Sequence, residues 1–420
     1  MPSLPPSQSR HTPPAVTLPI QREWSRWPEI DEEQIAAASE VLRSGKINYW
    51  TGQQGRKFEE EFANFVDCKH GIALANGTVA LELALFSLGI GKNDEVIVPS
   101  RTFIATASAV VARGSTPVCA DVDYQSQNIT ADTIAAQVTP RTKAIIVVHL
   151  AGWPCDMDPI LELAHRYGLV VIEDCAQAHG ARYKGRPVGS MGDVAAFSFC
   201  QDKIMTTAGE GGMLVTNSES IWRRAWSHKD HGKSYRAVFE QNHPPGFRWL
   251  HESFGTNMRM TEVQAAVGRV ALRRLPTWVK TRRRNAALLT ERLSKLEGLK
   301  IPVPPADIYH SYYKFYALLD PQCLHPDWCR DRILEAISAS GVPCYSGSCS
   351  EIYLEKAFSD TMRPAERRHY ARQLGETSLM FLVDPTLTEQ HMSRTAETLA
   401  QVIQSASDAG QRGYFSPQAA

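Results

Sequence analysis

Apolar and polar positions alternate in a regular way over the first half of the chain. Short apolar runs, each about the length of one strand, are separated by stretches with the composition of helices, such as residues 104–112. The strand-like runs cover residues 96–99, 117–122, 144–149, 170–174 and 195–199. Because these runs are largely apolar, they indicate strands that are buried on both faces. The alternation predicts an α/β fold in which helices sandwich a mostly parallel, doubly wound central sheet.

The pattern changes after residue 260. An amphipathic stretch runs to about residue 275, and Thr261 and Gln264 are spaced to form a capping box at its start. A second helix is expected over about 279–296, followed by a proline-rich linker. The remainder, with a strand candidate at 314–319, is typical of a smaller α+β unit.

These patterns divide the chain into three parts. Prolines at positions 2, 5, 6, 13, 14 and 19 favour a mobile tail over residues 1–20. Residues 21–298 are expected to form a large domain that includes the connecting helices. Residues 299–420 are expected to form a small C-terminal domain, and 420 residues suffice for two sizeable cores.

Composition narrows the class of partner. The formal net charge of zero argues against nucleic acid or an anionic membrane as the main partner. A basic run at 280–284 is interpreted as a solvated helix face, with binding of a sugar diphosphate as the alternative. Nine cysteines without CxxC spacing indicate a reducing compartment, and no metal site is expected. The sequence shows neither a signal-peptide core nor a run long enough to span a bilayer, so a cytoplasmic location is expected.

One strand end combines a hydroxyl and an amine. The apolar run 195–199 contains Ser198, Lys203 follows five positions later, and a glycine-rich turn comes next. A hydroxyl can hold a phosphate oxygen, and a lysine amine can capture an aldehyde as a Schiff base. Pyridoxal phosphate (PLP) carries both groups on one small ring. The alternative is a solvent-exposed lysine in an ordinary loop.

A second strand end places a carboxylate where α/β sheets bind their ligands. The apolar run 168–172 is followed by Glu173 and Asp174, with Gln177 three residues after Asp174. In a PLP enzyme such a carboxylate pairs with the protonated pyridine nitrogen. The alternative is that Asp174 and Gln177 form a capping box for a following helix.

A third strand leads through Asn76, Gly77 and Thr78 into the helical pattern that begins at Val79. Free backbone N–H groups and the positive end of a helix dipole favour a phosphate at such a turn. Turns of this kind are common in α/β proteins. Ser198 would supply a second phosphate contact.

Five blocks in the same order resemble the DegT/DnrJ/StrS-type aminotransferases, a branch of the fold-type I PLP enzymes that act mainly on sugars and cyclitols. The blocks cover residues 76–81, 94–103, 173–180, 198–212 and 255–266. The resemblance extends over about residues 25–410 and implies the fold-type I architecture, with a smaller C-terminal α+β domain. One departure stands out, because Ala208 occupies a position of the turn after the lysine where family members often have glycine. We expect an ordinary backbone conformation there.

The resemblance also implies the roles of individual residues. Lys203 would be the Schiff-base lysine and proton carrier, Asp174 the partner of the pyridine nitrogen, and Gln177 a neighbour of the phenolic oxygen. Phosphate would be held by Gly77, Thr78 and Ser198. Phe103 would stack on the cofactor ring, although an aromatic residue at a strand end more commonly packs into the core. Asn257 would reach the phosphate of a neighbouring subunit, which implies a homodimer with shared active sites.

The resulting hypothesis is a PLP-dependent transaminase. It would move an amino group from an amino acid, expected to be L-glutamate, to a keto-sugar, expected to be nucleotide-linked. The product would serve polysaccharide, glycan or secondary-metabolite biosynthesis. Two alternatives remain at this point: an aminotransferase for a keto-cyclitol in antibiotic synthesis that uses glutamine, and a non-catalytic regulatory relative.

Overall fold

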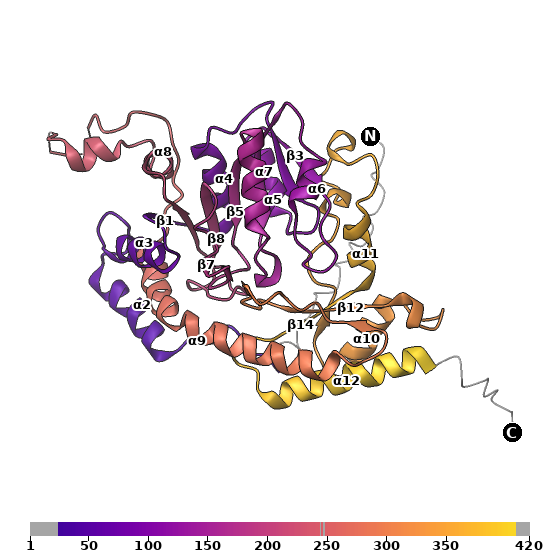
Figure 1. Ribbon diagram of the computed structural model, residues 1–420. Coiled ribbons are helices and arrows are strands. Elements are labelled where there is room, and N and C mark those ends of the chain that lie inside the picture. The colour runs from indigo at the N-terminus through magenta and orange to yellow at the C-terminus, as the bar shows by residue number, and fades with distance from the viewer. Residues whose placement is uncertain (1–23, 244, 247, 409–420) are drawn as a thin grey trace, which may run out of the picture.

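The computed structural model describes residues 24–243, 245–246 and 248–408. The expected N-terminal tail, residues 1–20, lies outside the described residues. Figure 1 shows a large body built around one sheet, and a smaller sheet that lies against the helices α9 (Glu262–Leu293) and α12 (Glu389–Asp408). The expected division into domains at residue 299 stays a prediction.

Seven strands form the central sheet, in the order β1-β9-β8-β5-β4-β2-β3. Neighbouring strands are parallel from β8 to β3, whereas β9 runs antiparallel to both of its neighbours. The strands are β1 (His70–Leu74), β2 (Glu95–Pro99), β3 (Thr116–Ala120), β4 (Thr142–Val148), β5 (Val170–Asp174), β8 (Val194–Ser198) and β9 (Gly212–Thr216). The predicted mostly parallel sheet is confirmed, because all five predicted strands are present and parallel.

Helices cover both faces of this sheet, and the strands alternate between the two cores. Val96 and Val98 of β2 face the core formed with α4, α5 and α8, whereas Ile97 faces the core formed with α6 and α7. The helix α3 and the first half of α9 pack beside α6 and α7, against β1, β8 and β9. The helices of this part of the chain are α2 (Glu32–Ser44), which packs against α9, and α3 (Gln54–Phe65), α4 (Gly77–Ser87), α5 (Ala105–Ala112), α6 (Ala131–Ala135), α7 (Met157–Tyr167) and α8 (Glu219–Lys229).

The second sheet is antiparallel and has the order β10-β12-β14-β13. Its strands are β10 (Leu299–Lys300), β12 (Phe315–Leu319), β13 (Cys344–Tyr345) and β14 (Ser378–Phe381). α10 (Arg330–Ala339), α12 and the second half of α9 share its core, and α11 (His369–Thr377) contacts β12. A three-stranded sheet of β11 (Ile308–Tyr309), β6 (Arg182–Tyr183) and β7 (Arg186–Pro187) lies beside them in the order β11-β6-β7.

Short helical turns complete the described part of the chain. They are η1 (Leu150–Gly152), η2 (Arg236–Glu240), η3 (Pro321–Cys323), η4 (Ile352–Leu354) and η5 (Asp360–Met362). All nine cysteines are free thiols. Among the described helices, none is both long and apolar enough to cross a bilayer.

The two helices expected on either side of residue 276 are one continuous helix, α9. It begins at the predicted capping box of Thr261 and Gln264 and continues through Pro276. An internal proline costs about 3 kcal/mol, because it removes a backbone N–H and its ring crowds the preceding turn. Both halves bury apolar side chains, Leu275 in the core against the central sheet and Leu289 in the core against the second sheet. We infer that this burial offsets the cost of the proline.

The interpretation of residues 280–284 as a solvated helix face is wrong for Arg282. Its side chain is buried, its Nη1 donates to the backbone oxygen of Tyr313 at 3.1 Å, and its guanidinium lies 4.9 Å from the ring of Trp27. Burial lowers the pKa of Arg282 to about 10. Because α9 is covered by both sheets, one position in each turn of this basic run has to face the interior.

Candidate active site

A cavity of about 870 Å³ opens at the carboxyl ends of β4, β5 and β8. Parallel α/β sheets bind ligands at this edge. The N-terminus of α4, the loop after β2 and side chains from the second sheet complete the walls. Seven of the eight predicted site residues line the cavity: Gly77, Thr78, Phe103, Asp174, Gln177, Ser198 and Lys203.

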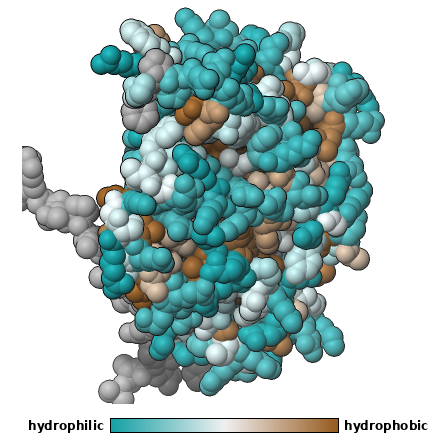
Figure 2. Space-filling view, turned by 90° about the vertical axis from the view of Figure 1, so that its left-hand side faces the viewer, coloured by the Kyte–Doolittle hydropathy of each residue, from teal (hydrophilic) through white to brown (hydrophobic). Residues whose placement is uncertain are grey.

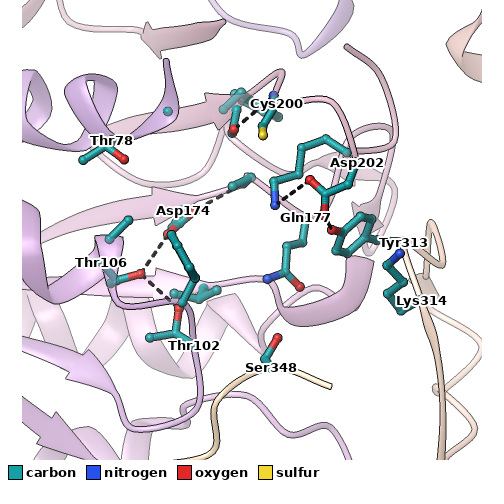
Figure 3. Close-up of a pocket in the computed structure, with 18 of the residues that line it drawn as sticks. Thr78, Thr102, Thr106, Asp174, Gln177, Cys200, Asp202, Tyr313, Lys314 and Ser348 are labelled. Carbon is teal, nitrogen blue, oxygen red and sulfur yellow. Dashed lines mark hydrogen bonds and ion pairs between the residues drawn. The ribbon is translucent and has the colours of Figure 1, made fainter. Parts of the chain in front are cut away.

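Lys203 extends into the cavity from the loop after β8. Its Nζ lies 3.6 Å from Oδ1 of Asp202 and 5.1 Å from the ring centroid of Tyr313. The hydroxyl of Tyr313 donates to Oδ2 of the same carboxylate (Figure 3). Burial raises the pKa of Asp202, but the charge of Lys203 and the hydrogen bond from Tyr313 outweigh it, so that this pKa lies below its ordinary value. The amine is therefore held next to an ionised carboxylate.

Asp174 is a buried carboxylate at the end of β5. Its Oδ2 accepts a hydrogen bond from Thr106 Oγ1 at 3.1 Å, and its Oδ1 accepts one from the backbone N–H of Ala176 at 3.1 Å. Burial raises the pKa of Asp174 above its ordinary value, against the lowering effect of these two hydrogen bonds. Among the described residues, no cationic side chain lies within ion-pair distance of it. A buried carboxylate of this kind is stabilised when a cation binds beside it.

The alternative of a helix cap at Asp174 is wrong. The residues after Asp174 form turns, and the next helix of the chain is α8. Gln177, the second member of the expected capping box, instead accepts a hydrogen bond from the N–H of Ala151 at 2.8 Å through Oε1. Its amide NH₂ group thereby remains available to the cavity (Figure 3).

The start of α4 forms a cradle for an anion. Asn76 caps the helix by accepting a hydrogen bond from Val79 N at 3.0 Å, while Gly77 and Thr78 line the cavity. A Cβ on Gly77 would lie 2.6 Å from the Cβ of Ser198, so glycine is required for the serine to approach the helix end. Backbone N–H groups, two hydroxyls and the helix dipole therefore converge at one point.

Phe103 lies at the cavity with 67% of its surface exposed. The alternative that this aromatic side chain packs into the core is wrong. A large apolar side chain that borders a cavity loses its exposed surface when a flat ring binds against it.

Asn257 does not line the cavity of its own chain. It is exposed on the segment between α8 and α9, where it pairs with Asp230 in an isolated β-bridge. Its Oδ1 accepts a hydrogen bond from the N–H of Arg259 at 3.3 Å. The predicted role of Asn257 therefore depends on a second subunit.

Ala208 has a left-handed conformation with a φ of 61°, so the expectation of an ordinary conformation is wrong. The turn is held by hydrogen bonds from Thr207 Oγ1 to Glu210 O at 2.6 Å and from Gly209 N to Thr206 Oγ1 at 3.1 Å. A left-handed alanine costs about 1 kcal/mol. The hydrogen bonds of the turn therefore hold Ala208 at a positive φ, although alanine prefers a negative φ.

Sequence reasoning missed several residues of the cavity. Thr106, in the first turn of α5, donates a hydrogen bond to Asp174, and Asp202 is adjacent to Lys203 but was not predicted as a site residue. The others come from the second half of the chain: Tyr313, Lys314, Tyr316 and Ser348. No local pattern distinguishes these four, because only the folded chain brings them to the cavity.

The residues present fit pyridoxal phosphate. A carboxylate without a cationic partner suits its pyridine nitrogen, the cradle at α4 suits its phosphate, and the exposed face of Phe103 suits its ring. Lys203 supplies the amine that such a cofactor requires. These four features surround one cavity.

Comparison with known proteins agrees with this chemistry. Residues 28–400 match the DegT/DnrJ/EryC1/StrS aminotransferase family. The crystal structure of an aminotransferase from Psychrobacter cryohalolentis is 55% identical in sequence, covers 91% of this chain and 99% of its own, and has a TM-score of 0.90.

Curated relatives match over most of the chain as well. GDP-perosamine synthase of Caulobacter vibrioides is 41% identical over 325 residues, which cover 74% of this chain and 84% of the relative. UDP-N-acetyl-3-dehydro-alpha-D-glucosamine 3-aminotransferase of Acidithiobacillus ferrooxidans is 38% identical over 380 residues, or 89% and 95% of the two chains. The chain therefore belongs to the DegT/DnrJ/EryC1/StrS aminotransferase family and is a PLP-dependent transaminase.

Proposed function

We propose that the enzyme transfers an amino group from an amino acid, L-glutamate, to a keto-sugar linked to a nucleotide. The observation that carries the proposal is the cavity in which Lys203, Asp174 and the α4 cradle face one another. The names of the two curated relatives support a nucleotide-linked sugar as the acceptor. The amino sugar would enter polysaccharide or glycan biosynthesis.

Each residue has a role that its contacts support. Pyridoxal phosphate, when bound, supplies a reactive aldehyde carbon and a ring that withdraws electrons. Asp174, whose carboxylate is fixed by Thr106, would hold the ring nitrogen, and Gln177, whose Oε1 is occupied by Ala151 N, would donate from its amide to the phenolic oxygen. Gly77, Thr78 and Ser198 would hold the phosphate, and Phe103 would cover the ring.

Lys203 attaches the cofactor and moves the proton at the α-carbon of the donor. A lysine that abstracts a proton must reach the atom that loses it, and Lys203 extends freely into the cavity next to Asp202.

The acceptor class can be tested directly. Purified enzyme should aminate at least one keto-sugar of a panel linked to UDP, GDP or dTDP, with L-glutamate converted to 2-oxoglutarate in equal amounts. Mass spectrometry of the sugar product checks the transfer. A preference for a keto-cyclitol with L-glutamine as donor would contradict the proposal, and free keto-sugars serve as the control for the nucleotide.

We propose a homodimer with shared active sites, which is supported by Asn257 being exposed and lying outside the cavity of its own chain. On the side shown in Figure 2, apolar patches lie among hydrophilic side chains. Exposed large apolar side chains occur on α2 and on the segment after α8, among them Leu42, Trp249 and Phe254. Exposed apolar side chains of this size suit a subunit interface.

Mixing two inactive variants, Lys203→Ala and Asn257→Asp, should restore activity. A mixed dimer has one site with both defects and one site with neither, so random exchange of subunits should return about a quarter of the wild-type rate. The Asn257→Asp charge would oppose the phosphate across the interface. The rate of transamination is measured after subunits have exchanged.

The control is each variant incubated alone, which should remain inactive. Subunit exchange is verified independently by native mass spectrometry with one variant isotopically labelled. Verified exchange without any recovered activity, or an active monomer, would contradict the shared site.

A further inference from the structure

Lys314 lines the cavity, and also the small space beside it that Arg282 and Asp384 border, and its ammonium group has no polar partner among the described residues. It lies immediately before β12 and lines the cavity together with Lys203. Its Nζ is 4.8 Å from the ring centroid of Tyr313, and Nζ of Lys203 is 5.1 Å from the same centroid. Within the part of the chain that the structure describes, the Lys314 ammonium forms no hydrogen bond and no ion pair.

The carboxylates around Lys314 already have partners. Asp202 contacts Lys203 and Tyr313, whereas Asp384 accepts a hydrogen bond from Ser25 Oγ at 2.7 Å. Burial, followed by the charge of Arg282, lowers the pKa of Lys314 to about 8. The positive charge is therefore costly in the absence of ligand, and an anion in the cavity would compensate for it.

We propose that Lys314 binds a carboxylate of the amino-acid donor. This inference rests on the proposed function, because it assigns the anion of the donor to a residue of the same site. Among the described residues that line the cavity, Lys203 and Lys314 are the two cationic side chains. Lys203 is assigned to attachment of the cofactor and to transfer of the α-proton of the donor. Lys314 is therefore the cationic side chain that remains to bind the carboxylate.

The position of Lys314 favours binding of a carboxylate of the amino-acid donor over binding of the diphosphate of the sugar nucleotide. Lys203 must reach the α-carbon of the donor, and the α-carboxylate is bonded directly to that carbon. Lys314 lies beside Tyr313 and Asp202, the residues that contact Lys203 (Figure 3). The diphosphate of a sugar nucleotide is separated from the reacting carbon by the sugar ring, so a cation that binds it belongs further from Lys203. The 2-oxo acid product carries the same carboxylates, so one ammonium serves both directions of the reaction.

The test is the first half-reaction, in which wild-type holoenzyme is mixed with L-glutamate in the absence of any sugar and the cofactor absorbance is followed. Lys314→Gln should raise the apparent dissociation constant of L-glutamate by about 10–100-fold, the loss expected for a charged hydrogen bond. Lys314→Arg should restore most of the affinity, because a guanidinium also binds carboxylates. Lys280→Gln, which removes the same charge from an exposed position of α9, should match the wild type.

Two further probes identify the anion. If Lys314 binds the α-carboxylate, Lys314→Gln weakens L-alanine and L-glutamate equally, and if it binds the side-chain carboxylate, only L-glutamate is weakened. Binding of UDP should change by less than about twofold in the variant. Weaker binding of UDP with unchanged L-glutamate, or equal losses for both, would overturn the proposal.

A comparison of the wild type with Lys314→Arg tests the proposal even if Lys314→Gln does not fold. The dissociation constant of L-glutamate should rise faster with pH above about 8 in the wild type than in Lys314→Arg, because only the lysine loses its proton there. The titratable and charged groups around Lys314 are Asp202, Lys203, Tyr313, Arg282 and Asp384. These groups and the amine of the donor are the same in both proteins, so they do not account for a difference between the two pH profiles. Identical pH profiles would overturn the proposal, whereas a wild type that accepts no amino group from any amino acid would overturn the proposed function itself.

Discussion

Replacement of Lys203 by alanine should lower the rate of transamination by at least about 10³-fold, because the variant loses both the attachment of the cofactor and the base that moves the proton. The fold should be retained, since the side chain extends into the cavity and its ionic contact with Asp202, at 3.6 Å, is partly solvated. Steady-state rates and the melting temperature of the cofactor-free protein, compared with those of the wild type, check the two statements.

Chemical labelling separates attachment from general damage to the site. Borohydride reduction of the native holoenzyme, followed by peptide mapping, should place the pyridoxyl group on Lys203. Lys314 offers a matched control, because it is the other lysine that lines the cavity. The Lys314→Gln variant should still carry the label on Lys203. A label on any lysine other than Lys203 in the wild type would show that the assignment is wrong.

The fold was predictable where a local pattern decides the structure. The predicted strand 170–174 coincides with β5, because the apolar residues that lead into Glu173 and Asp174 indicate a strand that is buried on both faces. The run 117–122 was predicted too long, since β3 ends at Ala120 while Val122 is still buried outside the sheet. Pro276 was expected to separate two helices, but α9 continues through it because both halves of the helix pack against a core.

The site was predictable to the extent that its residues stand at strand ends and glycine turns. Ser198, Asp174 and Gly77 occupy such positions, and the structure places all three at one cavity. Local rules failed where tertiary contacts decide, as at Asp174, where a turn and Thr106 replace the expected helix cap. Lys314 could not be found from the sequence, because its position at the cavity depends on how the second sheet packs on the first.

Substitution of Asp174 by asparagine should lower transamination by roughly 10²–10³-fold, the loss typical of one electrostatic contact in a buried site. An amide has no charge to stabilise a protonated ring nitrogen. The folded structure should persist, because the amide oxygen can accept the hydrogen bond from Ala176 N while the amide NH₂ donates to Thr106 Oγ1, a hydroxyl that can accept as well as donate. The variant should also melt no lower than the wild type without cofactor, since burial of the carboxylate is itself unfavourable and raises its pKa.

Asp202→Asn supplies the matched control for this prediction. Asp202 is also a carboxylate of the cavity, but it is more exposed and lies beside Lys203 instead of at the end of β5. Loss of this partly solvated ion pair should change the rate by less than about fivefold. The contrast between the two variants, measured as kcat with saturating cofactor, tests the location of the charge and not only its presence. Near-normal turnover of Asp174→Asn would mean that the carboxylate only accepts the hydrogen bonds of the turn and of Thr106, and the assignment of the ring nitrogen to Asp174 would be wrong.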